Sequence, residues 1–183
     1  MPRFRPVLLT LALPFAAGCE TATDPVGSGP DLDPNGAVVS AGVIEKAAGT
    51  AFRFPLLPDG STTTVRHHFN VTKKADGSVH GLFTYDQGGV SLVVDVTCMT
   101  VVDGNKAWIA GIIRESTIGF LGHVSYFYTF DNGEGAQDPP DTISLVRVET
   151  VPGTGEADRF CDELPQILPP RDVERGNVTV RAR

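Results

Sequence analysis

The sequence predicts an all-β domain, built as a single antiparallel barrel or sandwich of about eight to nine strands. Apolar and polar residues alternate with a period of two along most of the chain after residue 36, and Gly, Asp and Pro separate the alternating segments. No segment shows the 3.6-residue period of a long amphipathic helix. Strands without helices pack as a sandwich or close as a barrel, and the sequence does not distinguish the two.

The first predicted hairpin joins residues 64–72 to residues 79–85. An Asp-Gly turn signal stands between the two segments. The alternation points one set of side chains inward, and it turns His68 outward. The inward set comprises Val65, His67, Phe69, Val71, Val79, Gly81, Phe83 and Tyr85.

The second predicted hairpin joins residues 91–102 to residues 106–116, and it is apolar enough to be central. One face of its first strand is expected to carry Leu92, Val94, Val96 and Cys98. In its second strand, Trp108 shares a face with Ala110 and Ile112. Trp108 is either a core residue or a platform for a ligand, and its place in the middle of an apolar strand favours the core.

The other predicted strands lie on both sides of these hairpins. They are residues 37–46, 50–56, 122–130, 141–149 and 176–182. In residues 122–130 the alternation groups Val124, Tyr126, Tyr128 and Phe130 on one side. Residues 156–168 are expected to hold at most a short helical turn near Cys161.

The first 18 residues have the layout of a secretory signal. Arg3 and Arg5 precede an uncharged run, residues 6–18, that ends on small residues. The run is shorter than the roughly 20 apolar residues that a spanning helix needs. The sequence therefore predicts a signal peptide at residues 1–18 rather than a transmembrane helix.

The end of that run, Ala16-Ala17-Gly18-Cys19, resembles the lipobox of bacterial lipoprotein signals. The resemblance implies that Cys19 receives a diacylglyceride thioether and becomes the new N-terminus; two or three acyl chains anchor a protein stably. Ala16 departs from the pattern, in which Leu is usual. The alternative is an ordinary signal that leaves Cys19 as a free thiol. The residue after the cysteine is Glu20 and not Asp. By resemblance to the sorting rules of bacterial lipoproteins, this favours the outer membrane.

Lipidation of Cys19 leaves an even pair, Cys98 and Cys161. An exported chain enters an oxidising compartment, so this pair is expected to form a disulfide. It would close a 63-residue loop, for which loop entropy gives about 4 kcal/mol of stabilisation. A reactive thiol or metal pair is the alternative, but no Cys-x-x-Cys spacing supports it.

Residues 19–36 are rich in Pro, Gly, Asp and Ser and predict a tether. The β domain is expected at residues 37–183. Removing Arg3 and Arg5 with the signal leaves 13 basic against 22 acidic residues, a formal charge of −9. An acidic chain without a basic run is a poor candidate for binding nucleic acid. It also has no basic patch to attract anionic lipid, so the lipid would hold the chain to the membrane.

Residues 42–180 resemble an all-β domain of many secreted and surface proteins of bacteria. The resemblance rests on the segments VTC, GNKAWIAGI, DNGEG and DTISL and on a closing GNVTV. It implies a surface domain and assigns no reaction or catalytic residue. The chain departs from the pattern in an insertion at residues 153–175, which contains Cys161.

The loop DNGEGAQDPPD, residues 131–141, is the best candidate for a site with its own chemistry. It offers five candidate calcium ligands, Asp131, Asn132, Glu134, Asp138 and Asp141. Calcium takes six to eight oxygen ligands, but the spacing is not that of an EF-hand. The favoured interpretation is a polar crossover that begins with an Asp-Asn-Gly turn.

The remaining residue types give little support for catalysis. Adjacent strand residues face opposite ways, so His67 and His68 do not readily chelate one metal, and His67 is expected to be a partly buried, hydrogen-bonded histidine. There is no Gly-x-Ser-x-Gly motif and no glycine-rich phosphate loop. We therefore expect neither a cofactor nor an enzyme.

Three functions fit these observations. The first is a non-catalytic, lipid-anchored module that binds an envelope protein or glycan, or that has a structural role in the envelope. The second is a carrier of a small apolar ligand whose barrel lumen is lined by Phe69, Phe83, Tyr126 and Tyr128. The third is a hydrolase with two converging carboxylates. The absence of catalytic motifs favours the first, and the fold class cannot decide among them.

Overall fold

The computed structural model describes residues 42–135, 137–152, 155–166 and 168–183. The predicted signal peptide, Cys19, the tether and the domain boundary at residue 37 lie outside these residues. The elements in the described part are β1 (Val43–Arg53), β2 (Val65–Lys74), β3 (Val79–Gln87), β4 (Val90–Val102), β5 (Lys106–Ser116), β6 (His123–Phe130), β7 (Thr142–Ile143), β8 (Arg147–Pro152), helix α1 (Gly155–Glu163), β9 (Arg171–Asp172) and β10 (Arg175–Ala182).

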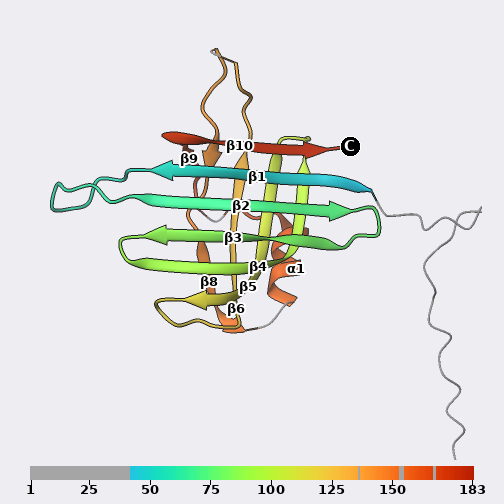
Figure 1. The fold of residues 1–183 in the computed structure, drawn as a ribbon, viewed down its shortest axis with the longest axis horizontal. Helices are drawn as coiled ribbons and strands as arrows, with labels where there is room; N and C mark the ends of the chain where they lie inside the picture. Colours follow the sequence, from blue (N-terminus) through green and yellow to red (C-terminus); the bar gives the residue numbers. More distant parts are fainter. Residues whose placement is uncertain (1–41, 136, 153–154, 167) are drawn as a thin grey trace, which may run out of the picture. The chain divides into compact units, whose positions relative to one another are not determined.

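The strands form one antiparallel sheet, and the predicted all-β fold is confirmed (Figure 1). Strands β1 to β6 are a meander in which each strand pairs with the next, and β10 returns to pair with β1. The two predicted hairpins are β2–β3 and β4–β5. The first two predicted segments form the single strand β1, whereas predicted strand 141–149 is divided between β7 and β8.

The sheet curls into a half-barrel, and two carboxylates bridge its open side. Asp131 follows β6 directly, and its Oδ2 accepts a hydrogen bond from the backbone N–H of Val180 in β10 (2.9 Å). Asp141 precedes β7, and its Oδ2 accepts one from Val178 (2.8 Å). Unpaired N–H groups on an edge strand are a general liability. Here the side chains of Asp131 and Asp141 satisfy two such N–H groups on β10. They thereby join the β6–β7 side of the sheet to its β1–β10 side.

Phe127 in β6 lies at the centre of the inner face of the curled sheet. Its ring makes edge contacts with Phe69 and Phe83 at centroid distances of 5.2 and 5.0 Å. Strand β1 provides space for these rings because its inward residues are small. A Cβ atom at Gly49 would lie 3.2 Å from the ring of Phe69 and 2.5 Å from the backbone oxygen of Asn177. We call the residues packed here the inner cluster: Ala47, Ala51, Val65, Phe69, Val71, Phe83, Tyr85, Leu92, Val94, Val96, Met99, Ala107, Ile109, Ile113, Phe127, Ile143, Val178 and Val180.

Helix α1 covers the outer face of β4, β5 and β6. It has nine residues and is longer than the short turn expected from the sequence. Ala157, Phe160 and Cys161 form its buried stripe, at the i, i+3, i+4 spacing of an amphipathic helix. We call the residues packed here the outer cluster: Cys98, Trp108, Ala110, Val124, Tyr126, Tyr128, Ala157, Phe160 and Cys161.

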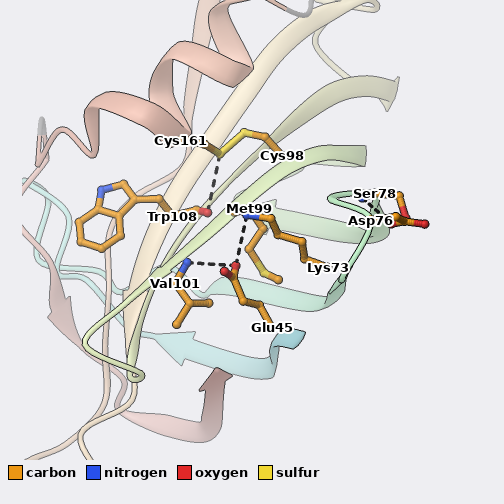
Figure 2. A network of polar contacts seen from close by, with 9 residues as sticks. All are labelled: Glu45, Lys73, Asp76, Ser78, Cys98, Met99, Val101, Trp108 and Cys161. Carbon is orange, nitrogen blue, oxygen red and sulfur yellow. Dashed lines mark hydrogen bonds and ion pairs between the residues drawn. A yellow bond between two sulfur atoms is a disulfide. The ribbon is translucent and has the colours of Figure 1, made fainter. Parts of the chain in front are cut away.

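The predicted disulfide between Cys98 and Cys161 is present and joins β4 to α1 (Figure 2). The prediction that Cys98 shares a face with Val96 is wrong. The pairing of β4 with β5 shifts between these two residues, which marks a β-bulge. Gly111 lies opposite, where a Cβ atom would be 2.1 Å from the backbone oxygen of Asp95. The extra residue turns Cys98 outward and returns Met99 to the inner cluster.

A half-buried ion pair lies on the inner side of β4, near the turn between β2 and β3 (Figure 2). Lys73 Nζ is 3.7 Å from Glu45 Oε2 and donates a hydrogen bond to the backbone oxygen of Met99. Glu45 accepts one from the backbone N–H of Val101 (3.3 Å). Each charge thus has a charged and a backbone partner, as partly buried ions require.

Candidate binding cleft beside the helix

Two of the clefts on the surface of the described domain contrast in size and enclosure. A shallow groove of about 340 Å³ crosses the outer face of β1, β2 and β3 and the turn before β4. A smaller and more enclosed cleft of about 90 Å³ lies beside α1. The smaller cleft is lined by Tyr126, Glu149, Glu156, Arg159, Phe160, Glu163 and Pro165. This helix cleft is the candidate site, because it combines aromatic rings with three carboxylates.

The sequence of α1 places the walls of the helix cleft. Glu156 in the first turn is favourable at the positive end of the helix dipole. The buried stripe turns Phe160 toward β6, where its ring stacks on Tyr126 at a centroid distance of 4.2 Å. Glu156, Arg159 and Glu163 are spaced by three and four residues and therefore follow one side of the helix. The disulfide holds this short helix in place against the sheet.

Tyr126 and Glu149 form the floor of the helix cleft. The Tyr126 hydroxyl donates a hydrogen bond of 2.5 Å to Glu149 Oε1, which also lies 3.4 Å from Arg147 Nε. Burial, followed by the hydrogen bond and the charge of Glu149, raises the pKa of Tyr126 well above its ordinary value. The hydroxyl therefore keeps its proton at neutral pH and acts as a donor and a binding group rather than as a base.

Arg159 lies at the mouth of the cleft between two acids of its own helix. Its guanidinium is 2.7 Å from Glu156 and 4.0 Å from Glu163. The Arg159 side chain is 61% exposed, so these pairs contribute little to stability. The last turn of α1 carries no basic residue, although a helix C-terminus favours cations. Because the ion pairs of Arg159 are weak, a ligand that donates hydrogen bonds can take the place of its guanidinium beside Glu156 and Glu163 at a small cost in free energy.

Trp108 is a core residue, as its position in the strand predicts. It is 3% exposed and stacks on Tyr128 at 5.7 Å. Its Nε1–H donates to the backbone oxygen of Pro165, and the Tyr128 hydroxyl donates to that of Leu168. Both contacts tie the segment after α1 to the outer face of β5 and β6.

The four aromatic residues predicted to line one lumen do not face a common space. Phe69 and Phe83 belong to the inner cluster, whereas Tyr126 and Tyr128 belong to the outer cluster. The alternation within each strand is as predicted. The error lies in which face of β6 is internal: Phe127, between the two tyrosines, is the residue that fills the half-barrel.

The polar side chains of the acidic loop form hydrogen bonds in the described structure. Among the residues that the structure describes, no three His, Cys, Asp or Glu side chains are placed to hold one metal ion. Asp131 and Asp141 bind backbone N–H groups of β10, and Asp138 accepts from Gly135 (2.7 Å). The two remaining predicted ligands also have partners: Glu134 binds Asn177, and the Asn132 side chain binds Pro140.

His67 is more buried than predicted, and neither ring nitrogen has a hydrogen-bond partner in the described structure. The expectation of a partly buried, hydrogen-bonded histidine is therefore wrong. Its ring lies 5.1 Å from that of Tyr85 and 5.7 Å from that of Phe127. Burial, and then the charge of Arg53, lower the pKa of His67 from 6.5 to about 3, so the ring is neutral.

Sequence reasoning did not identify the helix cleft. The signal was present in residues 155–163, where Ala157, Phe160 and Cys161 have helical spacing. That period extends over only two turns, which is short for a sequence pattern. The pairing of Tyr126 with Glu149 depends on the contact between β6 and β8, which local sequence does not indicate.

Comparison with protein-family models, with curated proteins and with solved structures finds no match to the chain. The resemblance to a bacterial surface domain therefore stays a prediction. Within the described residues, no helix is long and apolar enough to span a bilayer.

Proposed function

We propose that the chain is a lipid-anchored, non-catalytic binding module of the bacterial cell envelope, held through Cys19, with the outer membrane as its location. The helix cleft is the contact site for an envelope glycan or protein. The observation that carries this proposal is the contrast between a half-barrel filled by side chains and an acceptor-rich cleft on a disulfide-held helix.

The lining of the helix cleft indicates the chemistry of the ligand. Glu149, Glu156 and Glu163 provide carboxylate oxygens, which accept hydrogen bonds. Tyr126 and Phe160 are each 5% exposed, so they close the base of the cleft and leave little ring surface for a ligand to contact. Hydroxyl, amide or amine groups of a ligand are therefore the groups that this cleft accommodates. Its size suits one such group, and a protein partner would require much additional surface around it.

The two other functions receive less support. A carrier needs an internal cavity of several hundred cubic ångströms, and the rings of Phe69, Phe83 and Phe127 occupy the inner face. A hydrolase needs an acid and a base among its carboxylates. In the cleft, Glu149 is engaged by Tyr126 and Arg147, while Glu156 is paired with Arg159. These interactions favour binding over proton transfer.

The anchor is tested by the intact mass of the protein extracted from membranes, measured with and without reduction. We expect a mass that includes acyl chains on Cys19, and a gain of two hydrogen atoms when the disulfide is reduced. A Cys19→Ser variant should lose the acyl mass and leave the membrane fraction. An unmodified Cys19 in the native protein would contradict the anchored part of the proposal.

The cleft is tested with two probes, an N-acetylglucosamine oligosaccharide and a tetralysine peptide. Binding to the full-length protein in detergent is measured by calorimetry. We expect Glu149→Gln and Tyr126→Phe to weaken binding of the preferred probe about tenfold, which corresponds to one charge-assisted hydrogen bond. Asp86→Asn, in the groove on the opposite part of the sheet, is the matched control and should leave binding unchanged. Equal binding by all variants would exclude the helix cleft as the site.

A further inference from the structure

Exposed apolar side chains gather in two loops of the domain. Nine large apolar side chains are exposed in the described part of the chain, and six of them lie in residues 54–57 and 118–121. Leu56 and Leu121 are the most accessible, at 72% and 63%. Single apolar residues on a surface are ordinary, but here three of four consecutive residues are exposed and apolar in each of two loops. We call this group the apolar rim: Phe54, Leu56, Leu57, Ile118, Phe120 and Leu121.

The topology places both loops at the same end of the sheet. Strands β1 to β6 form an antiparallel meander, so the β1–β2, β3–β4 and β5–β6 connections share one end. Figure 1 shows the two loops projecting on the same side of the sheet, at the left of the view. Hydrogen bonds between Thr117 and the Gly89 and Ser91 backbones tie the β5–β6 loop to the β3–β4 turn. Strand β1 starts at the opposite end.

The β1–β2 loop holds its leucines outward by its own hydrogen bonds. The backbone N–H of Leu57 donates to the oxygen of Ser61 (2.7 Å), and that of Gly60 donates to Leu57 (3.0 Å). Leu56 pairs with Thr62 in an isolated bridge. Residues 58–60 form the tip of this small hairpin, and Leu56 and Leu57 lie exposed on the arm that leads to it.

The β5–β6 loop keeps Phe120 exposed in an unfavourable backbone conformation. Its φ angle is +65°, in the left-handed region that non-glycine residues rarely occupy. The N–H of His123 donates to the oxygen of Phe120 (3.1 Å), and the N–H of Gly122 donates to that of Ile113 (3.0 Å). A strained residue that is held in place and exposed is characteristic of sites with a role in binding.

The charge of the two loops indicates what the rim contacts. Neither residues 54–64 nor residues 117–122 contain Lys or Arg, and Asp59 is their one acidic residue. The Asp59 carboxylate is engaged by the N–H and the hydroxyl of Ser61. The two loops therefore offer no basic side chain to anionic headgroups, and the Glu174 carboxylate beside them accepts a hydrogen bond from the backbone N–H of Phe54 (2.8 Å). Apolar side chains on projecting loops fit a soft apolar layer better than a flat protein surface, which needs about 800 Å² on each partner.

We propose that the apolar rim inserts into the interface of a lipid bilayer, the same bilayer that holds Cys19. The inference rests on the proposed lipid anchor, which keeps the domain beside that bilayer. Chain length permits the contact. The 23 residue-to-residue steps from Cys19 to Gly42 span at most about 80 Å when extended, whereas the 11 residues of β1 cover about 36 Å. The domain can therefore turn its rim toward the membrane.

The test uses tryptophan fluorescence in the full-length protein reconstituted into phosphatidylcholine vesicles with brominated acyl chains. Leu121→Trp places a reporter in the rim, and wild-type protein gives the background from Trp108, which is buried. Leu82→Trp is the matched control, because Leu82 is 41% exposed in β3, away from the rim. In vesicles without bromine, we expect the added fluorescence of Leu121→Trp to shift to shorter wavelength. In brominated vesicles, we expect that fluorescence to be quenched and the added fluorescence of Leu82→Trp to be retained.

Flotation of the same vesicles reports the anchor separately. A protein that floats while Leu121→Trp remains as bright as Leu82→Trp overturns the rim proposal and leaves the anchor intact. Leu121→Trp that is shielded from acrylamide but not quenched by bromine also overturns it, because a protein or a second copy would then cover the rim. A wild-type protein that does not float contradicts the proposed anchor, and with it the insertion that depends on the anchor.

Discussion

The inner and outer clusters bury similar residue types but are held together differently. Eight strands contribute to the inner cluster, and each contributing strand is hydrogen-bonded to its neighbours. The outer cluster depends on α1, a helix of nine residues that contacts β4, β5 and β6. A helix this short is marginal by itself in water. The disulfide joins Cys98, which is paired with Ala110 inside the sheet, to Cys161 of the helix, so a covalent bond fixes α1 to the sheet.

A matched pair of phenylalanines should show the largest difference between the clusters. Phe127→Ala empties the centre of the inner cluster, where the ring contacts Phe69, Phe83 and His67. We expect a loss of about 3–5 kcal/mol in the free energy of unfolding, since the surrounding strands cannot collapse into the space. Urea denaturation followed by circular dichroism measures it.

Phe160→Ala is the control in the outer cluster. Phe160 is 5% exposed and packs on Tyr126, but it belongs to an element that the sheet does not require. We expect a smaller loss of global stability, together with faster amide exchange confined to residues 155–163. Equal losses from the two substitutions would show that the clusters unfold as one unit and would remove the distinction.

Removing the disulfide should give the next largest effect and should act mainly on the outer cluster. Replacing Cys98 and Cys161 by Ala releases a 63-residue loop, and we expect a loss of about 2–4 kcal/mol. Hydrogen exchange should increase in α1 before it increases in β2 or β3. An equal increase in all of these elements would contradict the local role. Reduction of the wild-type protein provides the same comparison without a substitution.

The inner cluster was the more predictable of the two. Alternation in β2 and β3 identified Phe69, Phe83 and their neighbours, because both strands are regular. It failed at Cys98, since a bulge is specified by the close approach of Gly111 to β4 and not by the β4 sequence alone. It also failed to say which face of β6 is internal, because apolar residues occupy both faces of that strand.

The candidate site was less predictable because its residues come together through tertiary contacts. The disulfide followed from counting cysteines in a chain that the sequence predicts to be exported. Glu149 and Phe160 are far apart in the sequence from Tyr126, and no short motif links the three residues. The acidic loop was recognised as unusual, but its carboxylates serve the edge of β10, a partner that lies 37 or more residues further along the chain.

The carboxylate bridge gives a third and smaller test, at the edge where the inner cluster closes. Asp141 is 7% exposed and accepts hydrogen bonds from the N–H groups of Asn132 and Val178. Asp141→Asn turns an amide NH₂ toward one of these donors. We expect a loss of about 1.5–3 kcal/mol, typical of hydrogen bonds to a charged group. Asp138→Asn, exposed in the same loop, should change thermal stability little. Similar effects of both would show that the bridge to β10 is not the cause.

The buried histidine gives the finest test, because it acts on the inner cluster alone and only at acidic pH. The pKa of His67 is lowered by burial, and then by the charge of Arg53, from 6.5 to about 3. Between these pH values the unfolded chain binds a proton that the folded protein does not. Stability should therefore fall as the pH falls below 6.5, by about 2 kcal/mol at pH 5.

His67→Phe should remove that part of the pH dependence and leave the stability at pH 7 nearly unchanged. The substitution replaces two unpartnered ring nitrogens by carbon among Tyr85 and Phe127. His80, which is exposed, is the control position, and His80→Phe should keep the wild-type profile. The measurement is urea unfolding at pH 7 and pH 5. A parallel loss in wild type and His67→Phe would place the acid sensitivity in carboxylates, and the inner cluster would then contribute to stability through packing alone.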